Sequence, residues 1–158
     1  NQLNQYIPSS WDNKHLLTIT TGKKLNKNWE IGTKFRLVGG KPYTPYDVNA
    51  SSIIANYDVV NRGILDYTSL NTERFSTYSQ LDFRVDKTWF WSKFSLNFYV
   101  DVQNVLASKS NAQSFLLPTL DANGNKVINA NDASRYVLED VENTSGNVLP
   151  RFGLIVDF

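Results

Sequence analysis

The chain has 158 residues, of which 13% are aromatic, and it contains neither cysteine nor methionine. Its 16 basic and 15 acidic residues give a net charge of +1, which does not support nucleic-acid binding, because nucleic-acid-binding domains usually carry a basic face. The lack of cysteine excludes a disulfide framework, thiol catalysis and cysteine-ligated metal sites.

Five segments alternate between apolar and polar residues, a pattern typical of β-strands with two different faces. We predict strands at about residues 11–23, 29–39, 78–89, 93–105 and 149–158. No stretch has convincing helical periodicity with caps, and no apolar run reaches the roughly 18 residues that a transmembrane helix needs. The sequence therefore predicts an all-β, antiparallel fold.

The links between these strands alternate between short and long. Residues 25–28 and 91–92 form tight turns, whereas residues 40–77 and 106–148 are long loops. Long loops are uncommon in compact soluble domains, but barrels of the outer membrane have short periplasmic turns and long extracellular loops. We therefore predict an antiparallel transmembrane β-barrel segment whose last strand runs to a periplasmic C-terminus.

The apolar faces and the aromatic residues agree with this prediction. A tilted strand crosses a bilayer in roughly 9–11 residues, which matches the predicted lengths. Aromatic side chains favour the headgroup zone, and they cluster near the strand ends. Those expected at the periplasmic rim are Trp29, Trp89, Phe90, Trp91 and Phe158, and those expected at the opposite rim are Trp11, Tyr43, Tyr46 and Tyr78.

The number of strands indicates an incomplete barrel. An open sheet edge in lipid leaves backbone groups unpaired, and the smallest common barrels need about eight strands. Five strands cannot close such a barrel. We expect either a larger polypeptide, which we favour, or several chains that share one barrel.

Several segments together resemble the late barrel region of TonB-dependent outer-membrane transporters of the Bacteroidetes type. The resemblance runs from Trp11 to Phe158, and its ordered set of motifs, with the terminal Phe158, is more specific than any single one. The segments are Ser10–His15, Trp29–Gly32, Gly39–Tyr46, Asn71–Arg74, Leu81–Lys87, Leu96–Val105 and Leu149–Gly153.

The resemblance implies a location in the outer membrane of a Gram-negative cell and a 22-strand barrel, of which this chain supplies about five strands. It also implies an N-terminal plug, a TonB box and energised uptake of scarce nutrients such as iron chelates or oligosaccharides. The partners it implies are the remainder of the barrel and the plug, the TonB complex, the barrel-assembly machinery, outer-membrane lipid and lipopolysaccharide, and a surface lipoprotein.

A row of charged side chains is expected on the face turned to the barrel lumen, because a charge facing lipid costs roughly 2–4 kcal/mol at the midplane. We favour structural pairing across strands over contact with a plug or substrate. The row comprises Glu30, Lys34, Arg36, Asp82, Arg84 and Asp86. Phe158 is either an assembly signal, as in the resembling family, or an ordinary aromatic at the rim.

Substrate contact is expected in the extracellular loop at residues 40–77, since exposed loops often carry function. The candidate residues are Tyr43, Tyr46, Tyr57, Arg62 and Tyr67. A self-packed loop is the alternative. In the other loop, residues 121–132 distantly resemble a calcium loop, but Lys126 takes the place of the required glycine, so we favour a hairpin with its turn at Asn123–Gly124.

No catalytic constellation is present, and His15 is the only histidine, so we predict neither an enzyme, nor a metal site, nor a cofactor. Two other functions remain open. One is a non-transporting outer-membrane barrel, such as an adhesin or a structural subunit of a membrane complex. The other is a soluble sandwich or lipocalin-like ligand binder.

Overall fold

The computed structural model describes residues 6–158, which form two compact units. Unit 1 contains the described residues up to 12, together with residues 41–75 and 111–144. Unit 2 contains residues 13–40, 76–110 and 145–158. Each unit is assembled from segments that lie far apart in the sequence.

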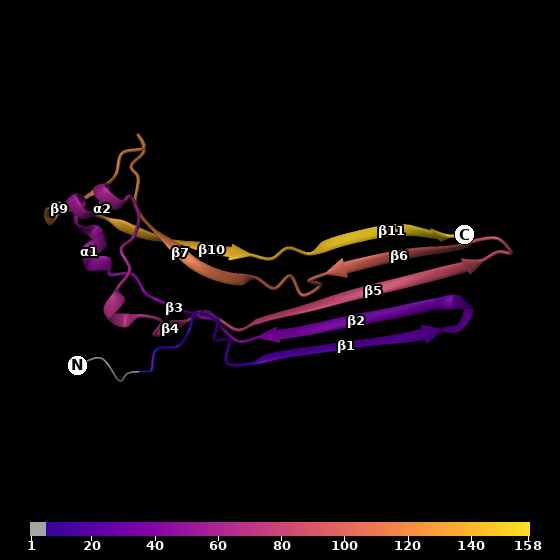
Figure 1. The fold of residues 1–158 in the computed structure, drawn as a ribbon. Helices are drawn as coiled ribbons and strands as arrows, with labels where there is room; N and C mark the ends of the chain where they lie inside the picture. The colour runs from indigo at the N-terminus through magenta and orange to yellow at the C-terminus, as the bar shows by residue number, and fades with distance from the viewer. Residues whose placement is uncertain (1–5) are drawn as a thin grey trace. The chain divides into compact units, whose positions relative to one another are not determined.

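Unit 2 is a five-stranded antiparallel sheet with the strand order β1-β2-β5-β6-β11 (Figure 1). The prediction of a mostly antiparallel β-fold is therefore confirmed. The strands are β1 (Leu16–Leu25), β2 (Trp29–Val38), β5 (Tyr78–Phe90), β6 (Ser95–Gln103) and β11 (Leu149–Asp157). Strand β1 starts at Leu16 rather than near residue 11, because the preceding residues turn, with Lys14 at φ 57°.

Two short turns join neighbouring strands, as the sequence predicts. The turn between β1 and β2 is the 3-10 segment η1 (Asn26–Asn28), in which Lys27 and Asn28 adopt φ values of 59° and 60°. The turn between β5 and β6 is closed by a hydrogen bond of 2.9 Å from the Trp91 amide to the Phe94 carbonyl. The Trp91 and Phe94 rings stack at 4.7 Å between centroids.

Asn104 ends strand β6. It is 4% exposed and has a left-handed φ of 54°. Its side chain accepts a hydrogen bond from the Ser108 amide and donates to the carbonyls of Ser108 and Asn147. The same residue therefore connects the two ends of the long link between β6 and β11.

Unit 1 contains the two links that the sequence analysis predicts as loops, and they are far from structureless. The sequence analysis found no helical stretch there, whereas the structure has two short helices, α1 (Val48–Ser52) and α2 (Ile54–Val60), with the 3-10 segment η2 (Tyr67–Ser69). Three two-stranded sheets accompany them: β3 (Pro42–Tyr43) with β4 (Glu73–Arg74), β7 (Ser110–Pro118) with β10 (Leu138–Ser145), and β8 (Ile128–Asn129) with β9 (Asp132–Tyr136).

A small core explains why these segments are ordered. Tyr57 and Leu116 are 2% and 6% exposed, and Ser51 is fully buried. The Ser51 hydroxyl accepts a hydrogen bond of 2.8 Å from the Ile64 amide, which satisfies a backbone donor inside the core. Asp47 caps α1 by accepting a hydrogen bond of 2.8 Å from the Ala50 amide.

Candidate functional site

The register of the unit 2 sheet places most of the apolar side chains of its five strands on one face. Directly paired residues of antiparallel strands share a face. Ile19 pairs with Phe35, Phe35 with Leu81, Val85 with Val100, and Val100 with Phe152. Phe98, Leu154 and Phe152 on this face are 36%, 65% and 81% exposed. Unit 2 thus presents a broad apolar surface, defined here as the apolar face.

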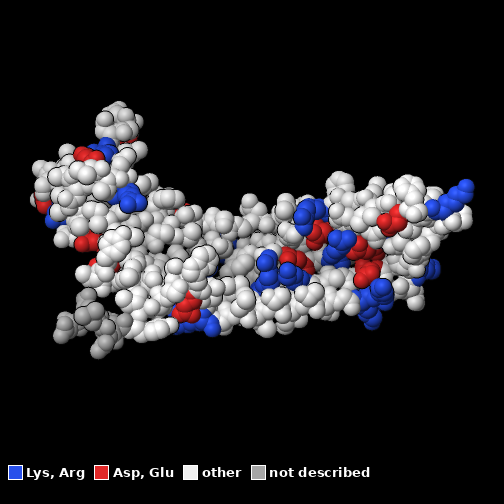
Figure 2. All heavy atoms as spheres, in the orientation of Figure 1, with Lys and Arg blue, Asp and Glu red and all other residues white. Residues whose placement is uncertain are grey.

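The opposite face carries the predicted row of charges and is called the polar face. All six predicted residues have the same parity: Lys34 pairs with Asp82, Glu30 with Asp86, and Arg36 with Gln80, while Arg84 faces Gly32. Figure 2 shows basic and acidic side chains interspersed over the strands of unit 2. Two sequence-distant strands therefore contribute to one charged surface.

The ion pairs on the polar face differ in part from the expected cross-strand pattern. Arg84 binds Asp86 of its own strand through two hydrogen bonds of 2.8 and 2.7 Å. This pair explains how Asp86 can stand opposite another acidic residue, Glu30. A cross-strand pair that the sequence analysis missed joins Arg151 to Asp101 at 2.6 Å. Finding it requires the register between β6 and β11.

A three-layer contact on the polar face joins strands β5, β6 and β11. The Arg84 guanidinium lies over the Tyr99 ring, 4.1 Å from its centroid. Tyr99 pairs with Gly153 of β11, and a Cβ on Gly153 would lie 2.6 Å from the ring and hydroxyl atoms of Tyr99. The ring therefore occupies the space that a side chain at position 153 would fill, an arrangement in which an aromatic residue covers a glycine on the neighbouring strand.

Two lysines lie on the apolar face at the end of the sheet that carries the two short turns. Lys23 and Lys87 have the parity of Ile31 and Trp29, respectively. The Lys87 ammonium donates to the Lys27 carbonyl in the turn, and lies 5.4 Å and 5.6 Å from the centroids of the Trp29 and Trp89 rings. The lysine stem thus follows the apolar face while its charge reaches the turn.

Phe158 follows the last residue of β11 and is fully exposed. Asp157 pairs with Ser95, so the strand end lies at the same end of the sheet as the turn between β5 and β6. The position agrees with the end of the sheet to which the sequence analysis assigns Phe158. Its role in assembly remains a prediction.

The five candidate substrate-contact residues fall into three different environments in unit 1. Tyr57 is buried, and its ring makes an edge contact with Tyr136 at 6.1 Å between centroids. Tyr43 stacks on Phe75 at 4.4 Å, away from the remaining three. Tyr46, Arg62 and Tyr67 line one groove. We keep these three as the candidate site and treat Tyr57 as part of the packing.

The groove has a volume of about 390 Å³, within the range of roughly 300–1,000 Å³ found for small-molecule sites. We call it the Arg62 groove. Besides the three predicted residues it is lined by Val60, Gly63, Ile64, Leu65, Gln113 and Phe115. The sequence analysis missed Gln113 and Phe115, because their segment was assigned to a loop. Their alternate spacing on β7 was the available indication.

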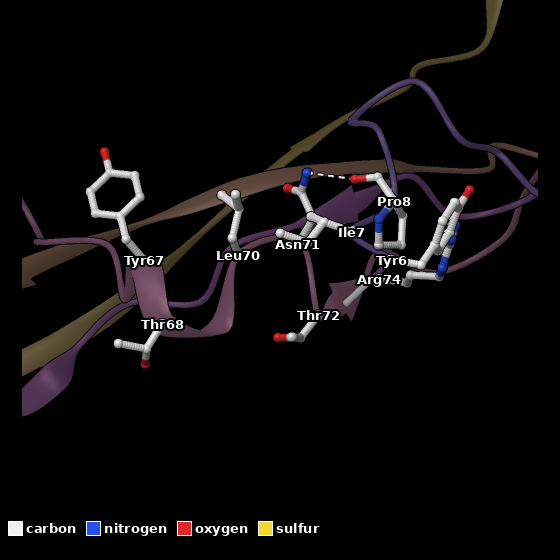
Figure 3. Close-up of a pocket in the computed structure, with 9 residues that line it drawn as sticks. All are labelled: Tyr6, Ile7, Pro8, Tyr67, Thr68, Leu70, Asn71, Thr72 and Arg74. Carbon is white, nitrogen blue, oxygen red and sulfur yellow. Dashed lines mark hydrogen bonds between the residues drawn. The ribbon is translucent and has the colours of Figure 1, made fainter. Parts of the chain in front are cut away.

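A second hollow of about 250 Å³ is lined in part by residues of η2 and the segment after it (Figure 3). Tyr67 stands at one end of this hollow, with Tyr6 and Arg74 at the other. The Asn71 amide donates a hydrogen bond of 2.8 Å to the Pro8 carbonyl, and Arg74 pairs with Asp12 at 2.5 Å. Its polar groups thus bind the segment that precedes β1, and the Arg62 groove is the better candidate.

The hairpin at residues 119–127 has its turn where the sequence predicts it. Gly124 has a φ of 82°, and Asp121 accepts hydrogen bonds of 2.8 Å from the amides of Asn123 and Asn125. The hydrogen bond from Asn125 is the largest cause of a lowered pKa for Asp121. Its carboxylate therefore stabilises the turn.

Lys126 anchors this hairpin on α2. Its ammonium lies 2.8 Å from the Asp58 carboxylate, and 5.1 Å and 5.0 Å from the centroids of the Tyr57 and Tyr136 rings. The hydrogen bond between the two residues lowers the pKa of Asp58 and raises that of Lys126. Both groups are therefore charged at neutral pH, and the contact connects two distant segments of unit 1.

Within residues 6–158, no group of three or more histidine, cysteine, aspartate or glutamate side chains is arranged to hold a metal ion. None of the helices in this part of the chain has the length and hydropathy needed to span a membrane. No protein-family model, curated protein or solved structure matches the chain.

Proposed function

We propose that the chain forms part of an outer-membrane β-barrel that belongs to a TonB-dependent transporter and takes up a scarce nutrient. The carrying observation is the register of unit 2, which separates an apolar face from a charged face over five strands. Soluble monomers rarely expose so broad an apolar surface. Hydrocarbon on one side and water or a plug on the other would require this division.

The height of the apolar face supports a membrane location. On β5, Ser79 and Lys87 bound the apolar positions Leu81, Phe83 and Val85. Eight residue steps at ~3.3 Å span ~26 Å along the strand, or ~20 Å along the normal of a barrel with a tilt of ~40°. The lipid-facing band of such barrels is about 25 Å tall. Lys87 and the two tryptophans near it would then lie at the interface.

The edges of the sheet support membership of a larger barrel. Strands β1 and β11 are the outermost strands of the five. In hydrocarbon, each unpaired backbone group would cost several kcal/mol, so both edges require neighbouring strands. The choice of a TonB-dependent transporter among outer-membrane barrels depends on the resemblance of the sequence motifs.

Single-cysteine labelling tests the membrane part of this proposal, and the natural chain has no cysteine to remove. A fluorophore at Phe83→Cys on the apolar face should be quenched by lipids with brominated tails. The matched variant Thr20→Cys, on the polar face, should be quenched by aqueous iodide instead. Equal lipid quenching at both positions, or a protein that stays in solution without detergent, would contradict the proposal.

Uptake assays test the transport part. Cells that carry the protein should accumulate its nutrient, and a protonophore or loss of TonB should stop this accumulation. Membrane insertion without energised uptake of any nutrient would leave a non-transporting barrel as the function.

A further inference from the structure

The walls of the Arg62 groove are fixed by contacts within unit 1. The Tyr46 hydroxyl donates a hydrogen bond of 2.7 Å to the Ser114 carbonyl, and Tyr46 also forms a β-bridge with Leu65. A Cβ on Gly63 would lie 2.8 Å from the Tyr46 ring, so the backbone approaches this ring closely. The Tyr46 ring, which forms one wall of the groove, therefore has little freedom to move.

Among the residues that the structure describes, Arg62 is the only charged one that lines the groove. Its side chain is exposed and, among residues 6–158, has no hydrogen-bond or ion-pair partner. Three acidic residues of the same segment have partners other than Arg62: Asp47 caps α1, Asp58 pairs with Lys126, and Asp66 accepts hydrogen bonds from Thr68 and Ser69. Among residues 6–158, the Arg62 guanidinium therefore has no carboxylate partner, and no acidic side chain lines the groove.

The remaining exposed surface of the groove is mostly apolar and aromatic. Tyr67 and Phe115 are 71% and 52% exposed, although both are large hydrophobic side chains. Gln113 adds a polar side chain that, among the described residues, forms no hydrogen bond of its own. A flat ring can contact the aromatic walls while a polar group reaches Arg62.

We infer that the Arg62 groove binds a small planar carboxylate, with its ring against Tyr67 and Phe115 and its carboxylate on the Arg62 guanidinium. A guanidinium matches a carboxylate through two parallel hydrogen bonds, and one cation balances one carboxylate charge. A neutral sugar would leave this charge without a partner. This inference names a ligand class for the proposed transporter. It depends on the proposed function in one respect, namely that the groove is exposed to the external medium.

Fluorine NMR with 4-fluorobenzoate, on the detergent-purified protein as its gene encodes it, tests this inference. The neutral analogue 4-fluorobenzamide measures the contribution of the charge. Replacing Arg62→Gln should weaken binding of the benzoate about tenfold and leave that of the benzamide nearly unchanged. Replacing Phe115→Ala should weaken binding of both compounds.

The matched charge control is Lys41→Gln, since Lys41 is an exposed cation of unit 1 outside the groove. It should bind both compounds as the natural chain does. Cyclohexanecarboxylate carries the same charge on a non-planar ring, and its binding is measured by displacement of 4-fluorobenzoate. It should bind more weakly than the benzoate.

Four results would overturn the inference: no binding of 4-fluorobenzoate at millimolar concentration, equal affinity for benzoate and benzamide, an Arg62→Gln variant that binds as before, or a Lys41→Gln variant that loses binding equally. Amide hydrogen exchange of α1 and α2 should show that Arg62→Gln remains folded. The quenching experiment at Phe83 and Thr20 does not depend on this titration. A failure of the ligand-binding inference can therefore be distinguished from a failure of the barrel proposal.

Discussion

Replacing Gly153→Ala tests whether the contact between Tyr99 and β11 stabilises the sheet. The new Cβ would lie 2.6 Å from the hydroxyl and ring carbon atoms of Tyr99, well inside van der Waals contact. Arg84 lies over the Tyr99 ring, 4.1 Å from its centroid, and opposes a shift of the ring toward it. Arg84 is in turn held by Asp86 through two hydrogen bonds.

The expected cost follows from two opposing effects. Overpacking typically destabilises by about 1–3 kcal/mol, and we expect the lower part of this range because the clash is with the end of a side chain. Replacing glycine by alanine also lowers the conformational entropy of the unfolded chain, which stabilises the folded state by about 0.4–1 kcal/mol. The matched control is Gly22→Ala, also on the polar face, where the new Cβ would lie 3.6 Å from the Ile31 carbonyl, an ordinary contact. We expect Gly153→Ala to be less stable than this control by about 1–2 kcal/mol.

Urea unfolding in detergent or lipid, followed by tryptophan fluorescence, measures these free energies. In a Tyr99→Ala background the ring is absent, so Gly153→Ala should behave as Gly22→Ala does. The coupling in this double-mutant cycle should therefore be about 1–2 kcal/mol. The reasoning is refuted if the two glycine variants are equally stable, or if the cost at Gly153 persists without the Tyr99 ring.

Three further predictions concern the apolar face and unit 1. Phe83→Arg should destabilise the protein in lipid by about 2–4 kcal/mol, whereas Thr20→Arg on the polar face should cost less than about 1 kcal/mol in the same unfolding assay; equal costs would contradict the assignment of the faces. Lys126→Gln should release the hairpin at residues 119–127 from α2 and make it several-fold more sensitive to limited proteolysis, as should Asp58→Asn; unchanged cleavage would refute its anchoring role. The hydrogen bond from Lys126 lowers the pKa of Asp58, so the stabilising contribution of this pair is complete only well above the ordinary pKa of aspartate and disappears as the pH falls through the lower folded-state pKa. Carbon NMR of the Asp58 carboxyl group should show a titration midpoint below the ordinary pKa of aspartate, and this midpoint should rise in the Lys126→Gln variant.

The strands of unit 2 could be predicted from the sequence because each alternates strongly over most of its length. Strands β2 and β5 have clear apolar and polar positions, and their bounds differ from the predicted ones by a single residue at one end. Strand β1 was less clear, since threonines at Thr18, Thr20 and Thr21 lie on both faces. The alternation identifies faces but not partners, so the Arg151–Asp101 pair was not foreseeable.

The helices and short strands of unit 1 could not be predicted from the sequence, because they are too short to show a periodic pattern. Helices α1 and α2 have five and seven residues, too few to repeat an apolar position over several turns. The local indications were the cap residues, Asp47 before α1 and the left-handed Asn61 after α2. The Arg62 groove needs β7 from the other link, so three of its residues were predicted and the aromatic wall at Phe115 was not.

The hydrogen bonds of Asn104 have a consequence for how this protein could diversify. By connecting Ser108 and Asn147, they close the base of a link of about forty residues next to the sheet. Once the base is closed, doubling the length of a flexible insertion adds only about 0.6 kcal/mol of closure entropy. Homologous proteins could therefore exchange whole ligand-binding segments above this asparagine, and engineers could graft new ones there, while the strands beneath keep their alignment.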